Sequence, residues 1–127
     1  GNGRIFQFGI RSGDREEFSW GRTHVRTNRF NFDTLEEVVE QLQGKPVYFT
    51  LDLDVLDPSV FPGTGTPEPG GVSFEELRKA ATLVCSKLRI VGCDVNELSP
   101  HYDQSGVSTI VACKIVREMV LAMQKDK

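Results

Sequence analysis

The chain has 127 residues, of which 39% are hydrophobic and 26% are charged, and its formal net charge is −3. This composition is ordinary for one globular domain, and a weakly negative chain without a basic run is a poor candidate for binding nucleic acid. No apolar stretch approaches the roughly 20 residues of a membrane span, and the first residues do not resemble a signal peptide, so we expect a cytoplasmic protein.

The first third of the chain predicts two short strands and one helix. Residues 4–10 have the apolar character of a buried strand, and residues 24–30 alternate weakly, as in a second strand. Between them, residues 16–20 have the pattern of a single helical turn. Residues 35–42 predict a longer helix, because Thr34 to Glu37 fits a capping box, although Asp33 is a rival N-cap.

Residues 47–54 alternate between apolar and polar side chains, which predicts a strand with two different faces. On such a strand Asp52 and Asp54 would lie side by side, because residues two apart point in the same direction. Two neighbouring carboxylates repel each other unless something positive lies between them. We therefore expect a divalent cation here; the alternative is that both carboxylates only cap turns.

The segment from Leu56 to Gly71 contains four prolines and four glycines, which exclude regular structure. A long ordered loop at the carboxyl end of a strand commonly carries function. Within it, Asp57 precedes Pro58 and is predicted to be a structural acceptor in a turn.

The last third of the chain predicts a helix, a strand and a second helix. Ser73 to Glu76 forms another capping box and begins a helix that extends to residue 88. Residues 88–96 read as a core strand that ends at Glu97. The final helix, residues 107–125, is expected to face inward with Ile110, Val111, Ile115, Met119 and Met123.

Strands that alternate with helices in this way predict an α/β fold, a parallel sheet with helices on both faces and hence three layers. In such sheets ligands bind beyond the carboxyl ends of the strands. Asp52 and Asp54 end one strand and Glu97 ends the next, so we expect all three at one edge of the sheet.

The cysteines and histidines do not suggest a site of their own. Cys85, Cys93 and Cys113 lie in apolar segments at wide spacings, which favours free, buried thiols in a reducing compartment over disulfides or metal ligands. His24 and His101 have no partner histidine at ligand spacing and are predicted to lie in loops or at the surface.

Two long motifs resemble the ureohydrolases, the family of arginases and agmatinases. Thr50 to Pro58, followed by the proline- and glycine-rich loop, resembles the family signature. Val91 to Asp103 resembles a later family motif, and its Glu-x-x-Pro-x-Tyr-Asp form is closer to agmatinase than to arginase. Phe8 to Arg11 also resembles the family. The resemblance extends over nearly all of residues 1–127 and corresponds to the C-terminal half of the family's α/β domain.

The resemblance implies a binuclear manganese site and a guanidine substrate. It implies that Asp52 bridges two Mn²⁺ ions, that Asp54 binds one of them, that Glu97 holds the substrate guanidinium, and that Thr64 and Thr66 help to shape the pocket. Mn²⁺ prefers oxygen donors, and a carboxylate can bind a planar guanidinium through two hydrogen bonds. The implied reaction is hydrolysis of agmatine to putrescine and urea.

The family's upstream Gly-Gly-Asp-His and Asp-Ala-His-x-Asp motifs, and its proton-shuttling histidine, do not occur in this sequence. We therefore assign no catalytic residue and expect this chain alone to be inactive. An exposed sheet edge is also expected, and with it a homo-oligomer. Three alternatives stay open: another activity of the family (arginase, guanidinobutyrase or formiminoglutamase), a non-catalytic binding or regulatory module, and an α/β interaction domain.

Overall fold

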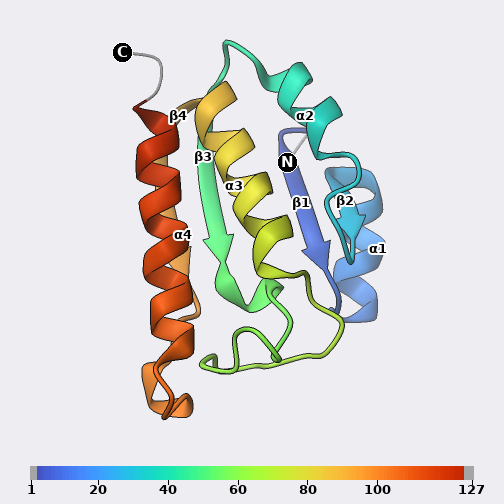
Figure 1. Ribbon diagram of the computed structural model, residues 1–127. Coiled ribbons are helices and arrows are strands. Elements are labelled where there is room, and N and C mark those ends of the chain that lie inside the picture. The colour runs from blue at the N-terminus through green and yellow to red at the C-terminus, as the bar shows by residue number, and fades with distance from the viewer. Residues whose placement is uncertain (1–2, 125–127) are drawn as a thin grey trace.

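The computed structural model describes residues 3–124 and has an α/β architecture (Figure 1). Four strands, four α-helices and two short 3₁₀ turns follow one another in this order: β1 (Ile5–Ile10), α1 (Arg15–His24), β2 (Val25–Arg29), α2 (Leu35–Leu42), β3 (Pro46–Asp52), a 3₁₀ turn (Leu53–Val55), α3 (Phe74–Lys87), β4 (Arg89–Asn96), a second 3₁₀ turn (Pro100–Tyr102) and α4 (Val107–Met123). The predicted class, parallel strands with flanking helices, is confirmed. No helix within residues 3–124 is long and apolar enough to cross a membrane.

The strands form two separate parallel pairs. β1 pairs with β2, and β3 pairs with β4 so that Asp52 lies opposite Asn96. β1 and β3 point the same way in Figure 1, but no ladder of hydrogen bonds joins them within the described residues. The sheet is therefore interrupted between β1 and β3. The polar face of β3, expected to be covered, is open, and Tyr48 on that face is 63% exposed.

Two apolar clusters hold the helices against the strands. One cluster joins α3 and α4, which lie side by side in Figure 1, to the carboxyl end of β3. The second joins α2 to α3 through Leu35, Val39, Val84 and Leu88. Leu53, Leu56 and Phe61, which follow β3, are each at most 1% exposed. The start of the proline- and glycine-rich loop is thus anchored in the core, which gives the site at its end a fixed position.

Side-chain caps explain where two of the helices begin. α1 is ten residues long, not the single turn expected, because Asp14 and Glu17 form a capping box: the Glu17 amide donates to Asp14 Oδ1 at 2.8 Å, and the Asp14 amide donates to Glu17 Oε2 at 3.0 Å. The predicted box from Ser73 to Glu76 at the start of α3 is confirmed.

The predicted capping box at the start of α2 is wrong. Thr34 is the N-cap residue, but its side chain accepts no capping hydrogen bond. Its hydroxyl instead donates to Asn28 Oδ1 at 2.9 Å, which ties the helix to the end of β2. A tertiary contact has therefore replaced the local one.

Two predictions of burial are also wrong. Ile110 in α4 is 69% exposed, because the buried stripe of that helix consists of Ser108, Ala112, Ile115, Met119 and Ala122. All three cysteines are free, as expected, but only Cys85 is buried. The other two are exposed: Cys93 lies on β4, which has a strand on one side only within the described residues, and Cys113 lies on α4 beside an open hollow.

Candidate active site

The acidic pair lies where β3 ends, but the geometry differs from the prediction. β3 stops at Asp52, and Asp54 belongs to the 3₁₀ turn Leu53–Val55, so the alternation of the strand does not place the two side chains together. They nevertheless interact. Partial burial raises the pKa of Asp54, and the charge of Asp52 raises it further. The two carboxylates are thus within electrostatic reach of each other.

Arg11 holds the turn that carries Asp54. Its guanidinium donates to the backbone carbonyl of Asp54 at 2.6 Å and to that of Val55 at 2.9 Å. The arginine is therefore bonded to the backbone of the turn and not to either carboxylate. This role of Arg11 was not predicted from the sequence. The signal for it was an arginine directly after an apolar strand, in the segment from Phe8 to Arg11 that resembles the family.

Asp57 fixes the path of the proline- and glycine-rich loop. Its carboxylate accepts hydrogen bonds from the Ser59 hydroxyl and amide, at 2.6 and 3.0 Å, and from the amides of Gly70 and Gly71, at 2.8 and 3.2 Å. These bonds, with those from Ser59 the largest, lower the pKa of Asp57 to about 2. A Cβ at Gly71 would lie 2.4 Å from the Asp57 amide nitrogen, so only glycine fits there. The predicted structural role of Asp57 is confirmed.

The loop returns to the acidic pair through Thr66. The Thr66 hydroxyl donates to Asp54 Oδ2 at 3.4 Å, whereas the neighbouring Thr64 is only 3% exposed. Of the two threonines, Thr66 is therefore the one that touches a candidate metal ligand.

Glu97 lies at the same edge of the sheet. It follows Asn96, the residue opposite Asp52. Its side chain is exposed, and its backbone φ is 70°. A residue other than glycine with positive φ is uncommon and often marks a functional position. The segment after Glu97 is tied to the loop, because the Ser99 amide donates to the Gly63 carbonyl at 2.7 Å.

Asp52 and Asp54 open into a groove of about 780 Å³ between β1 and β3, whereas Glu97 does not line it. Arg11, Asp52, Asp54, Thr66 and Glu68 line one end of it. Within residues 3–124, no three Asp, Glu, His or Cys side chains gather closely enough to hold a metal ion. Asp52 and Asp54 are therefore not joined by a third such side chain within the described residues.

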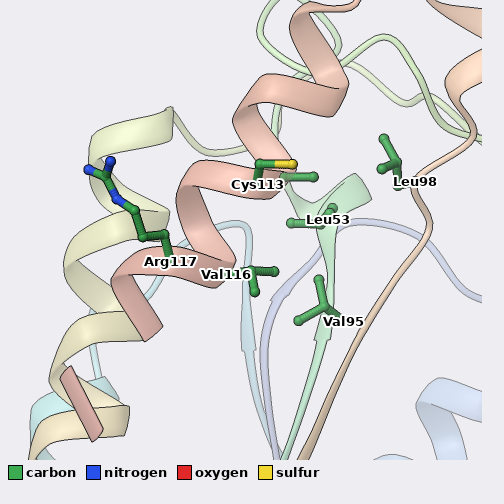
Figure 2. Close-up of a pocket in the computed structure, with 7 residues that line it drawn as sticks. Leu53, Val95, Leu98, Cys113, Val116 and Arg117 are labelled. Atoms are coloured by element: carbon green, nitrogen blue, oxygen red, sulfur yellow. The ribbon is translucent and has the colours of Figure 1, made fainter. Parts of the chain in front are cut away.

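A second hollow, of about 430 Å³, lies between α4 and the ends of β3 and β4 (Figure 2). Its lining is apolar except for Arg117, whose guanidinium points away from the other labelled side chains in Figure 2. Neither Asp52 nor Glu97 lines it, so it is separate from the acidic edge.

Comparisons with known proteins agree with the motifs. The model of the arginase family matches residues 1–122. The agmatinase of Bacillus anthracis is 46% identical over 125 residues, which are 95% of this chain but 43% of that protein. The human mitochondrial guanidino acid hydrolase is 42% identical over 89 residues, 70% of this chain and 25% of that protein.

A solved structure from Clostridium difficile has a TM-score of 0.89 and 53% identity, over 94% of this chain and 44% of the solved one. The chain thus spans less than half the length of the relatives that it matches, and it corresponds to their C-terminal half. The chain belongs to the arginase family.

Proposed function

We propose that this chain supplies the carboxylate part of a binuclear manganese hydrolase, which converts agmatine and water to putrescine and urea. One observation carries the proposal: Asp52, Asp54 and Glu97 lie at the carboxyl ends of two paired strands, with Thr66 against Asp54. The Bacillus anthracis relative, named an agmatinase, supports this choice of substrate.

The side chains at this edge have the type of donor atom that binds a divalent cation. Asp52 and Asp54 offer oxygen donors, which Mn²⁺ prefers. Because burial and the charge of Asp52 disfavour ionisation of Asp54, a cation between them would relieve both effects. Arg11 leaves the carboxylates free, since its guanidinium is bonded to backbone carbonyls. When bound, Mn²⁺ would supply a Lewis acid and lower the pKa of a bound water.

Other residues near this edge would bind the substrate and orient the Asp54 carboxylate. Glu97 would accept hydrogen bonds from the substrate guanidinium, whose planar shape and permanent charge suit a carboxylate. The Thr66 hydroxyl would hold the Asp54 carboxylate in one orientation. Asp57 keeps Thr66 in place, because it closes the loop through Gly70 and Gly71.

A chimera tests the proposal directly. This chain would replace the 125 residues of Bacillus anthracis agmatinase that it matches, and urea release from agmatine would be measured with Mn²⁺ present. We expect an active enzyme.

Asp52→Asn should lower kcat at least about 100-fold, because the loss of a ligand exceeds the 10- to 100-fold effect of removing its supporting residues. Glu97→Gln should raise KM about 10- to 100-fold, the value of a lost charge-assisted hydrogen bond.

Glu40→Gln is the matched control, because this exposed carboxylate lies on α2, away from the acidic edge. It should leave kcat and KM within about threefold of the parent, as is usual for a surface substitution. An active chimera that is indifferent to Asp52→Asn would contradict the proposed site. An inactive chimera that folds and binds Mn²⁺ would favour a non-catalytic binding module.

The same assay decides between substrates. The human relative is named a guanidino acid hydrolase, so 4-guanidinobutyrate and arginine belong beside agmatine in the panel. A higher kcat/KM for either compound would replace agmatine as the substrate and leave the roles of Asp52, Asp54 and Glu97 unchanged.

A further inference from the structure

Gly63 joins the proline- and glycine-rich loop to the segment that follows Glu97. Its carbonyl accepts a hydrogen bond from the Ser99 amide at 2.7 Å, and its amide donates to the Ser108 hydroxyl at 2.8 Å. We call these two hydrogen bonds the Gly63 contact. A Cβ at Gly63 would lie 2.7 Å from Ser108 Cβ, so the loop lies directly against the start of α4, at the lower end of the view in Figure 1.

Asp103 holds the Ser108 side of this contact. Its Oδ2 accepts a hydrogen bond from the Ser108 amide at 2.7 Å, and its Oδ1 accepts from the Ser105 amide at 3.0 Å and from the Ser105 hydroxyl at 2.5 Å. The hydroxyls of Ser105 and Ser108, together with these amides, lower the pKa of Asp103. Ser108 is fully buried and Asp103 is 9% exposed. A buried network whose members are all bonded is rigid, so it fixes the loop at Gly63.

The Gly63 contact lies between two parts of the candidate site. Glu97 lies two residues before Ser99. Thr66, which contacts the acidic pair, lies three residues after Gly63. The side chain of the neighbouring Thr64 does not make this connection, because its buried hydroxyl has no hydrogen-bond partner within the described residues. The backbone of the loop is therefore held through Gly63.

The strands alone do not fix this distance. The ladder between β3 and β4 ends at Asp52 and Asn96, so Asp54 and Glu97 both lie beyond its last pair. The Gly63 contact joins the two chain segments that continue past this point.

We propose that Asp103 and Ser108 are positioning residues, which act through the Gly63 contact to hold Glu97 at a fixed distance from the acidic pair. This inference rests on the proposed function, in which Glu97 holds the substrate guanidinium. Neither Asp103 nor Ser108 lines the groove beside the acidic pair, so they act through the loop and not by touching the substrate. Reacting groups must be held closely, since a misplacement of about 1 Å can cost about 100-fold in rate.

Ser108→Ala in the chimera with Bacillus anthracis agmatinase is the first test. It removes the acceptor of the Gly63 amide but keeps the Ser108 amide that is bonded to Asp103. We expect kcat/KM for agmatine to fall about 10- to 100-fold, because the guanidinium is then held loosely. The affinity for Mn²⁺, measured by calorimetry, should change less than about threefold, because β3 and Arg11 still hold the acidic pair.

Ser105→Ala is the matched control. It removes a hydroxyl that is bonded to the same carboxylate, but to Oδ1, where the Ser105 amide stays bonded. Like Ser108→Ala, it should lower the Tm, whereas kcat/KM should stay within about threefold of the parent. Equal losses of activity in the two variants would mean that Asp103 and Ser108 only stabilise the fold, and would overturn the proposal.

A double-mutant cycle shows whether Ser108 acts through Glu97. Groups that act together have non-additive effects, whereas the effects of independent groups add. In a Glu97→Gln background, the effect of Ser108→Ala on kcat/KM should therefore shrink at least about twofold. Gly63→Ala, whose methyl group would press against Ser108, should couple to Glu97→Gln in the same way. Additive effects in both cycles would overturn the proposal.

Amide exchange in the isolated chain gives a readout that does not depend on activity. Ser108→Ala should speed exchange of the Gly63 and Ser99 amides at least about tenfold, because the two segments can then separate locally, whereas Ser105→Ala should not. Unchanged exchange in Ser108→Ala would overturn the proposal. An inactive parent chimera would contradict the proposed function alone, because the exchange rates still decide whether Ser108 holds Gly63 and Ser99 together.

Discussion

Asp54 and Asp57 lie three residues apart, but their surroundings shift their carboxyl groups in opposite directions. Asp57 receives four hydrogen bonds from Ser59, Gly70 and Gly71, and its pKa falls to about 2. Asp54 is partly buried beside Asp52, and its pKa is raised. The negative charge of Asp57 thus stabilises the loop, whereas the negative charge of Asp54 lowers the stability of the folded chain. A function for the Asp54 carboxylate would explain why a destabilising charge lies there.

The same substitution at these two positions should therefore have opposite effects on stability. Asp57→Asn should lower the Tm of the chain at pH 7, because the ionised acceptor is lost; this contribution is present above the ordinary pKa of 3.8 and disappears as the pH falls towards 2. Asp54→Asn should raise the Tm at pH 7, and the gain should vanish as the pH falls below 3.8, where the parent carboxyl is protonated in both states. Thermal melts of both variants between pH 3 and 7 measure these differences. Tm changes of the same sign in both variants would contradict the opposite effects of the two charges.

At the scale of elements, α4 shows how tertiary contacts select the buried face of an apolar helix. Apolar residues occur on several sides of α4, so its sequence does not single out one stripe. Ile115 is fully buried against the neighbouring cluster, while Ile110 points outward. The capping box of α3 shows the opposite case, because it forms from residues three apart and was predicted from the sequence. The pattern alone was not sufficient at α2, where Thr34 donates to Asn28 instead.

These two isoleucines give a matched test of the packing of α4. Ile115→Ala should lower the free energy of unfolding by about 2–5 kcal/mol, because it leaves a cavity in the core. Ile110→Ala, at a position that is 69% exposed, should change it by about 0.5 kcal/mol or less. Urea denaturation of the two variants measures the difference. Equal losses would mean that α4 packs through another face in solution.

At the scale of the whole molecule, the two neighbouring aspartates, Asp52 and Asp54, and the open groove lie at one place. Asp52 and Asp54 line the end of a groove in which, within residues 3–124, no strand lies. Since no third metal-binding side chain joins them in the described part of the chain, the chain alone should bind Mn²⁺ weakly.

Calorimetry on the isolated chain checks this expectation. A titration with Mn²⁺ should give a weak signal that Asp52→Asn reduces further, because a pair of carboxylates without other ligands holds a divalent ion poorly. The chimera with Bacillus anthracis agmatinase should bind two ions per chain under the same conditions. Tight binding of two Mn²⁺ ions by the isolated chain would contradict the expectation that it lacks some of the metal ligands.

The sequence by itself determined the order of strands and helices, the capping box of α3, the turn role of Asp57 and the family motifs around Asp52 and Glu97. These features depend on residues close together in the chain, so their patterns are local. Only the tertiary structure decided that, within the described residues, no ladder of hydrogen bonds joins β1 to β3, that Arg11 reaches the carbonyls of Asp54 and Val55, and that Ile110 lies at the surface. The physical reason is that each of these depends on which distant segments pack together and fill the space between them.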